Sequence, residues 1–146
     1  QGLGRNGTTM NSPHQSPTRR LVLLAASLSL CARGMAQTAP DADSVTLDEA
    51  RKEVDSGKAT LFDVREPQET ADGVAPGAKL LPLRQLAARF SEIPNDPKRP
   101  ILLICRTQNR SSATFKFLRE KGYTNVRFVQ GGMSEWVRRG LQLIKP

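Results

Sequence analysis

The residues best suited to chemistry lie in one short segment, where Cys105, four further residues and Arg110 follow an apolar run. Such a loop can turn several backbone N–H groups towards one centre and form an anion-binding nest. A helix beginning at Ser111 would add the partial positive charge of its N-terminus. Arg106 and Arg110 bring two guanidinium groups to the same place. These features favour a cysteine thiolate, so the segment predicts a nucleophile for an anionic substrate.

Each candidate residue also has a plainer interpretation. A lone cysteine at a strand end is often a small buried hydrophobe, but a structural cysteine needs no cations around it. Asp63, Arg65 and Glu69 are interpreted as a structural charge network that supports the loop rather than as catalysts. We therefore assign the catalytic role to Cys105, substrate binding to Arg106, Thr107, Gln108, Asn109 and Arg110, and loop support to Asp63, Arg65 and Ser111.

The rest of the chain limits how Cys105 could be activated. The only histidine, His14, and the second cysteine, Cys31, both lie within residues 1–36. If that part is removed, no internal disulfide, Cys–His pair or zinc site of the usual ligand set can form. Backbone dipoles and cations must then activate Cys105, and we expect no metal or organic cofactor.

Residues 1–36 have the features of a secretory signal peptide. Arg19 and Arg20 precede the apolar run 21–31, and Gly34-Met35-Ala36 offers a small-x-small cleavage site. The run is shorter than the about 20 residues that span a bilayer, so we expect no stable membrane insertion after cleavage. Residues 1–9 resemble no signal sequence and are treated as extra. We expect export, to the periplasm if the source is bacterial. The segment 18–23 partly resembles a twin-arginine signal, which leaves the export route open.

Charge argues against a nucleic-acid partner. The full chain has 22 basic and 14 acidic residues, a net charge of +8. Residues 1–36 hold four of the arginines and no acidic residue, so residues 37–146 carry 18 basic and 14 acidic residues, a net charge of +4. That excess is mild, and no basic run is interleaved with aromatic residues.

Strand and helix signals alternate after a predicted flexible leader at residues 37–44. A capping box at Thr46 and Glu49 begins the first helix. The apolar run 101–104 predicts a central strand buried on both faces. Apolar spacing and Gly or Pro stops predict the remaining elements: strands at 59–64, 79–82 and 126–129, and helices at 83–90, 111–121 and 131–140. In the helix 111–121, Ser111 or Ser112 should cap the start, and Ala113, Phe117 and Leu118 should lie on the inner side. Gly131-Gly132 is interpreted as a turn into the last helix.

This alternation predicts an α/β domain with a mainly parallel central sheet and helices on both faces. In such sheets ligands bind at the carboxyl ends of the strands. Cys105 directly follows the predicted central strand and therefore lies at that edge.

Residues 45–146 resemble the rhodanese-like family of sulfurtransferases. Cys105 to Arg110 resembles the family's six-residue active-site loop, in which the first cysteine receives sulfur. The segments 63–78 and 129–140 resemble the family's stretches before and after that loop, in the same order. Gln108 stands where many family loops carry glycine, and Val74-Ala75 stands where the family often has His-Ile. The resemblance implies the three-layer rhodanese fold for this part of the chain.

The resemblance also implies a reaction. A sulfane sulfur would pass from thiosulfate or a similar donor to Cys105, and then from the persulfide to cyanide, a thiol or a protein acceptor. Two alternatives use the same loop: a persulfide carrier that serves a partner protein, and a cysteine phosphatase or arsenate reductase. The phosphatases have five residues between cysteine and arginine, whereas four separate Cys105 and Arg110 here.

Overall fold

A computed structural model describes residues 42–146, and the predicted signal peptide and residues 37–41 of the predicted leader lie outside them. The helices are α1 (Leu47–Asp55), α2 (Pro67–Thr70), α3 (Asn109–Glu120) and α4 (Gly132–Arg138), with two 3₁₀ turns, η1 (Leu83–Gln85) and η2 (Phe90–Glu92). The strands are β1 (Ser44–Val45), β2 (Thr60–Asp63), β3 (Ala78–Leu80), β4 (Ile101–Ile104) and β5 (Val126–Val129).

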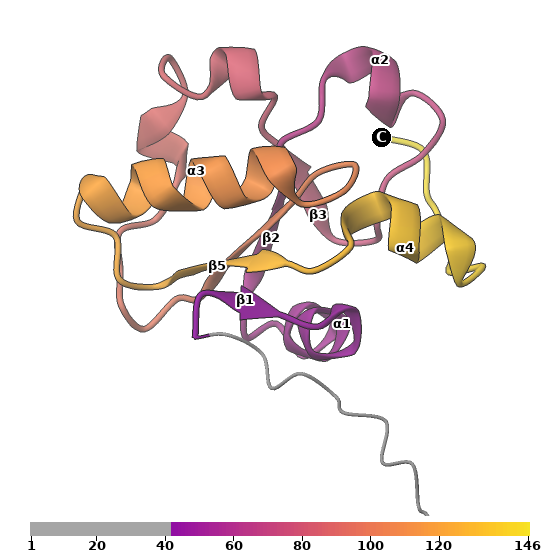
Figure 1. The fold of residues 1–146 in the computed structure, drawn as a ribbon, viewed down its shortest axis with the longest axis horizontal. Coiled ribbons are helices and arrows are strands. Elements are labelled where there is room, and N and C mark those ends of the chain that lie inside the picture. Colours follow the sequence, from indigo (N-terminus) through magenta and orange to yellow (C-terminus); the bar gives the residue numbers. More distant parts are fainter. Residues whose placement is uncertain (1–41) are drawn as a thin grey trace, which may run out of the picture. The chain divides into compact units, whose positions relative to one another are not determined.

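The five strands form one parallel sheet in the order β1-β5-β4-β2-β3 (Figure 1). The most apolar strand, β4, is in the middle and pairs with β2 on one side and β5 on the other. All four of its residues are buried. The expectation of a central strand buried on both faces is thus confirmed, and the loop that begins at Cys105 leaves the middle of the sheet.

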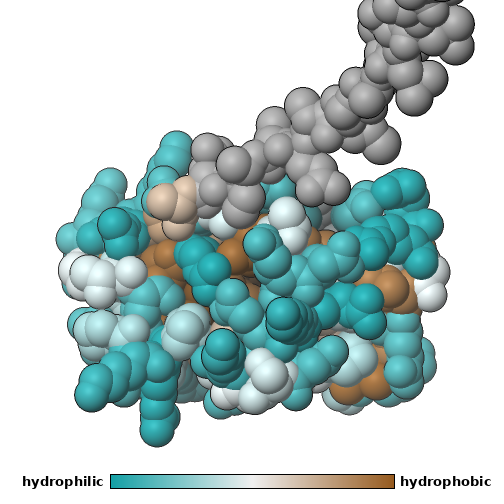
Figure 2. Space-filling view, turned by 90° about the horizontal axis from the view of Figure 1, so that it is seen from below, coloured by the Kyte–Doolittle hydropathy of each residue, from teal (hydrophilic) through white to brown (hydrophobic). Residues whose placement is uncertain are grey.

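Helices cover both faces of the sheet, which gives three layers. On one face α3 and the two 3₁₀ turns pack against Ile101 and Leu103. On the other, α1 and α4 pack against Leu102 and Ile104. The alternating side chains of β4 therefore reach both hydrophobic cores. The face seen in Figure 2 is largely hydrophilic, with hydrophobic patches between the polar groups.

The first helix begins as its sequence predicts. The Thr46 hydroxyl accepts a hydrogen bond from the Glu49 N–H, and the Glu49 carboxylate accepts one from the Thr46 N–H. Leu47 and Ala50 are buried against the sheet, and Val54 packs at the edge of the same core. None of the helices in residues 42–146 has the length and apolarity that crossing a membrane requires.

Three elements differ from the prediction. Ser44, expected at the end of a flexible leader, begins β1, and the Asp43 carbonyl beside it accepts a hydrogen bond from the Phe128 N–H. The segment 83–90 forms no continuous helix, because two separate 3₁₀ turns bring Leu86 and Phe90 to the core. The helix after the loop begins at Asn109, two residues earlier than expected.

A buried ion pair lies at the carboxyl end of β2. Arg65 donates through Nε and Nη2 to the Asp63 carboxylate, with Nη2 2.6 Å from Oδ2. Its two Nη groups also donate to the carbonyl oxygens of Glu69 and Gly73, each at 3.0 Å. These contacts satisfy both charges where water is excluded, and they tie α2 and the chain that follows it to the sheet.

Replacing Arg65 with methionine should therefore destabilise the domain by about 3–5 kcal/mol, because the Asp63 carboxylate would be left buried without its charged partner. Urea unfolding of the variant and the wild type measures this. The matched control is Arg99→Met, which breaks an exposed pair with Asp96 at 3.8 Å and should cost at most about 1 kcal/mol. Equal losses in the two variants would contradict the structural role of the buried pair.

Candidate active site

Cys105 lies at the carboxyl end of β4, where the central strand enters the loop before α3. Its side chain is almost fully buried, with 1% of its surface exposed. The Ser111 N–H donates to its Sγ at 3.4 Å, and the Ser111 hydroxyl lies 3.5 Å from Sγ. Ser111 is inside the first turn of α3, so it does not cap the helix as the sequence suggested; it contacts the cysteine instead.

The backbone of the loop directs its N–H groups away from other acceptors. Five successive N–H groups, those of residues 106–110, have no hydrogen-bond acceptor among residues 42–146. The last two belong to the open first turn of α3, whose N-terminus carries partial positive charge. An anion bound at the loop could accept several of these hydrogen bonds at once.

The N-terminus of α4 holds the carbonyl groups of the same loop. The N–H of Met133 donates to the Cys105 carbonyl and that of Ser134 to the Arg106 carbonyl, each at 2.8 Å. Gly132 makes this approach possible, since a Cβ at that position would collide with the carbonyl oxygens of Cys105 and Thr107. With their carbonyl oxygens bonded to α4, the loop peptides have fixed orientations.

Gln108 has a negative φ of −154°, with ψ −3°. It therefore does not adopt the left-handed conformation that favours glycine, although many family loops carry glycine at this position. Its side chain adds a further link, because the Gln108 Oε1 accepts a hydrogen bond from the Gly131 N–H at 3.2 Å. The departure at Gln108 therefore strengthens the contact between the loop and the start of α4.

Arg110, which closes the loop, is held by a carboxylate. Its two Nη atoms donate to the two oxygens of Glu69, each at 2.6 Å. Hydrogen bonding to Arg110 lowers the pKa of Glu69 from the usual 4.5 to about 2, although partial burial acts in the opposite direction. The same pair raises the pKa of Arg110, and the charge of Cys105 raises it further. Arg110 thus joins the loop to α2 and places a cation near the cysteine.

Arg106 has the opposite surroundings. Its side chain is exposed and forms no ion pair with any residue of 42–146. It lines a cleft of about 640 Å³ between the loop, α2, α4 and the C-terminal segment. Of the two loop arginines, Arg106 is therefore the one available to a ligand.

The structure brings the predicted site residues together in one region. Cys105 to Arg110 and Ser111 form the loop, and Asp63 and Arg65 lie at the adjacent strand end. The side chains of Thr107 and Asn109 are exposed, and their backbone N–H groups are among the five loop N–H groups that have no acceptor in residues 42–146. Within residues 42–146 no group of three His, Cys, Asp or Glu side chains could hold a metal ion.

Sequence reasoning missed the role of the α4 N-terminus and the partner of Arg110. The Gly131-Gly132 pair was interpreted only as a turn, although β5 and β4 are neighbours and both end at this edge. Glu69 was assigned to a charge network without a stated partner. The two adjacent glycines after β5 could have indicated the contact between α4 and the loop, because a close approach of two backbones commonly requires glycine.

A model of the rhodanese-like domain matches residues 46–139 of the chain. The chain belongs to the rhodanese-like family. A sulfurtransferase from Allochromatium vinosum is 37% identical over 92 residues, which are 63% of this chain and 84% of the relative.

Solved structures of rhodanese-like proteins are also similar. The human single-domain sulfurtransferase TSTD1 has a TM-score of 0.57 and 31% identity, covering 68% of this chain and 98% of that one. A rhodanese-related protein from Thermoplasma volcanium has a TM-score of 0.63 and 26% identity, covering 70% and 98%. The parallel sheet with helices on both faces is therefore the rhodanese-like fold.

The close contact between Gly132 and the loop can be tested through the stability of the domain. Gly132→Ala should destabilise it clearly more than Gly140→Ala, as measured by urea unfolding. Both glycines have positive φ, 57° and 64°, so each alanine carries the about 1–2 kcal/mol cost of a left-handed conformation. Only the Gly132 variant adds a collision with backbone, since nothing lies within 4 Å of a Cβ on Gly140. Equal destabilisation would contradict the close contact.

The Glu69–Arg110 pair should make stability depend on pH. Because the folded-state pKa of Glu69 is lowered, its contribution is complete above the unfolded value of 4.5 and is lost as pH falls towards about 2. The difference in unfolding free energy between wild type and Glu69→Gln should therefore be constant from about pH 7 to pH 5 and shrink below that range. Glu92→Gln, at an exposed pair with Arg89, is the control and should show a smaller difference throughout. A difference that grows towards acid pH would disprove the assignment.

Proposed function

We propose that the domain is a sulfurtransferase in which Cys105 carries the sulfur as a persulfide. In the first half-reaction the Cys105 thiolate attacks the outer sulfur of thiosulfate or a similar sulfane donor. A new S–S bond forms on Sγ, the S–S bond of the donor breaks, and its electron pair leaves with sulfite. This is nucleophilic covalent catalysis.

In the second half-reaction a thiophilic acceptor takes the outer sulfur. A thiolate or cyanide attacks that sulfur, the persulfide bond breaks, and its electron pair returns to Cys105 as the thiolate. Atoms and charge balance in both halves without a metal or an organic cofactor. The two steps share one enzyme intermediate, so ping-pong kinetics are expected.

One observation carries this proposal: the Cys105 sulfur lies at the start of a loop whose N–H groups lack acceptors. The Ser111 N–H is already 3.4 Å from Sγ. The N–H groups of residues 106–110 have no other acceptor among the described residues, so a persulfide anion could accept their hydrogen bonds. Arg106 could bind the departing anion from the cleft. The sulfurtransferase from Allochromatium vinosum and TSTD1 support the same chemistry through their similarity to this chain.

We also propose that the protein is exported before it acts. Support comes from the signal-peptide features of residues 1–36, which lie outside the described part of the chain. Outside the cytoplasm, small oxidants would be a hazard for a reactive thiolate.

Incubation with thiosulfate should add the mass of one sulfur atom to the protein. The mass should be measured on residues 37–146, in which Cys105 is the sole cysteine. Cyanide should remove the added sulfur and produce thiocyanate. Cys105→Ser is the control, because its hydroxyl is a much weaker nucleophile than a thiolate; it should show no mass gain and no turnover above background. Turnover retained in that variant would rule out Cys105 as the carrier.

Steady-state rates then separate an enzyme from a persulfide carrier. An enzyme should return to the free thiolate repeatedly with small donors and acceptors. A carrier should accept one sulfur atom and release it only to its partner protein. Multiple turnovers with thiosulfate and cyanide are the result expected here.

A further inference from the structure

The cleft beside the loop is larger than a thiosulfate ion requires. Its volume of about 640 Å³ falls within the roughly 300–1,000 Å³ of pockets for drug-sized ligands. It lies directly against the nucleophile's loop: Arg106, next in sequence to Cys105, lines it, and so does Met133, whose N–H donates to the Cys105 carbonyl. A sulfur donor with an organic group would therefore have space next to the loop.

One wall of this cleft is apolar and exposed. Val137 of α4 and Leu143 of the C-terminal segment line it, with 58% and 37% of their surfaces exposed. Ile144, the residue after Leu143, is 40% exposed. The remaining large exposed hydrophobic residue of the described part, Phe117 on α3, does not line the cleft. Exposed apolar side chains gathered at one cleft indicate a ligand with an apolar group.

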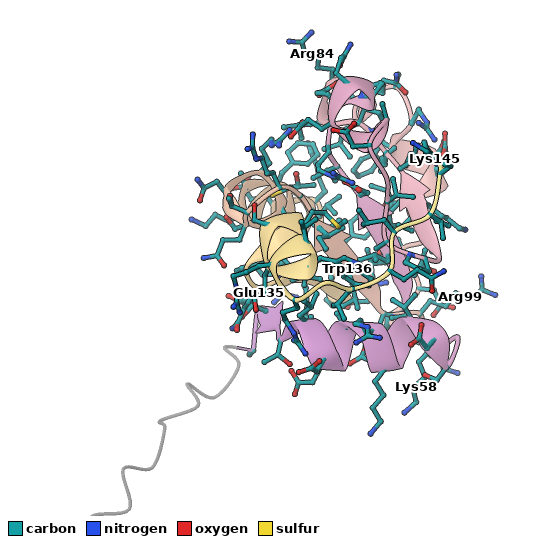
Figure 3. All side chains as sticks on the ribbon, turned by 90° about the vertical axis from the view of Figure 1, so that its right-hand side faces the viewer. Lys58, Arg84, Arg99, Glu135, Trp136 and Lys145 are labelled. Carbon is teal, nitrogen blue, oxygen red and sulfur yellow. The ribbon has the colours of Figure 1, made fainter. Side chains whose placement is uncertain are left out.

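Hydrogen bonds on both sides hold Leu143 in place. The Trp136 Nε1 donates to the Gln142 carbonyl at 2.9 Å. Ile144 pairs in antiparallel fashion with Val74, through two hydrogen bonds of 2.9 Å. Figure 3 shows the segment leaving α4 near Trp136 and running to Lys145, and Figure 1 shows it approaching α2. The apolar wall is thus formed before a ligand arrives.

Gly73 gives Leu143 its space in the cleft wall. A Cβ at Gly73 would lie 2.9 Å from the Leu143 Cβ, so the missing side chain lets the C-terminal segment pack closely. The Gly73 carbonyl is in turn held by Arg65 at 3.0 Å. The buried Asp63–Arg65 pair therefore holds Gly73, and Gly73 in turn lies against Leu143 in the apolar wall.

The lining of the cleft carries charges of both signs. Arg65, Arg138 and Glu69 line it but are paired with Asp63, Glu135 and Arg110, and the Asp72 carboxylate lines it as well. Arg106 has no such partner among residues 42–146. Of the three arginines that line the cleft it is the one whose charge is available to a ligand anion, and it is adjacent to the nucleophile.

We propose that this cleft selects an organic sulfane donor whose anionic group meets Arg106 and whose apolar group packs on Val137 and Leu143. The proposal rests on the proposed function and names the substrate class for it. A thiosulfonate, R–SO₂–S⁻, has these parts in their simplest form. The Cys105 thiolate attacks its terminal sulfur, the bond from that sulfur to the sulfonyl sulfur breaks, and the electron pair leaves with the sulfinate R–SO₂⁻.

The test compares kcat/KM for benzenethiosulfonate with kcat/KM for thiosulfate, with cyanide as acceptor. In the wild type the aromatic donor should have the higher value. The ratio of the two should fall about fivefold or more in Leu143→Ala and in Val137→Ser, because each loses apolar contact with the ring. Phe117→Ala is the matched control: Phe117 is as exposed as Leu143, at 37%, but lies outside the cleft lining. Its ratio should match that of the wild type.

Each ratio is taken within one protein, so a lower fraction of folded enzyme cancels. Ratios unchanged in both wall variants would overturn the proposal, and so would an equal fall in the Phe117 control. A wild type that prefers thiosulfate would overturn it as well and would assign the apolar wall to another occupant, such as a protein partner. If neither donor adds sulfur to Cys105, the proposed function itself fails; transfer from thiosulfate with unchanged ratios overturns the cleft proposal alone.

Discussion

The hydrogen bonds between the N-terminus of α4 and the loop after β4 are the contact on which the candidate site depends. They engage the carbonyl oxygens of Cys105 and Arg106, and so determine which way the loop peptides face. A peptide whose carbonyl is held on one side presents its N–H elsewhere, and here five successive N–H groups have no acceptor in residues 42–146. Only a glycine at position 132 permits so close an approach. The orientation of these N–H groups therefore depends on a second element, distant in sequence.

Two ion pairs extend this arrangement and have different functions. Asp63–Arg65 is buried and satisfied by backbone carbonyls, so it acts as a fixed part of the sheet edge. Glu69–Arg110 is partly exposed and joins α2 to the closing residue of the loop. Because Arg65 also holds the Glu69 carbonyl, the two pairs are connected through one residue. The loop is thus held from α4 through its backbone and from α2 through a side chain.

The sequence predicted the strands well because parallel buried strands are continuous apolar runs, as at Ile101–Ile104. It predicted the faces of α3 less well: Ala113 and Phe117 were expected inside, whereas Phe115 and Thr114 are buried beside Leu118. The helix also begins two residues earlier than expected. The position of Cys105 at the carboxyl edge of the sheet could be predicted, because it required only that residues 101–104 form a central parallel strand. The partner of Arg110 and the contact at Gly132 could not be found by spacing, because each joins segments that meet only in the folded chain.

The arginine that closes the loop also bears on the rival phosphatase chemistry. Bidentate binding of a phosphate, through two parallel hydrogen bonds, uses both Nη groups of one guanidinium. In this domain both Nη groups of Arg110 are bound to Glu69 at 2.6 Å. A phosphate would have to displace a carboxylate that is already ionised, and would leave it close to a second anion. A single sulfur atom on Cys105 needs only N–H donors, which the loop supplies. The geometry of Arg110 therefore favours sulfur transfer over phosphate ester hydrolysis, independently of loop length.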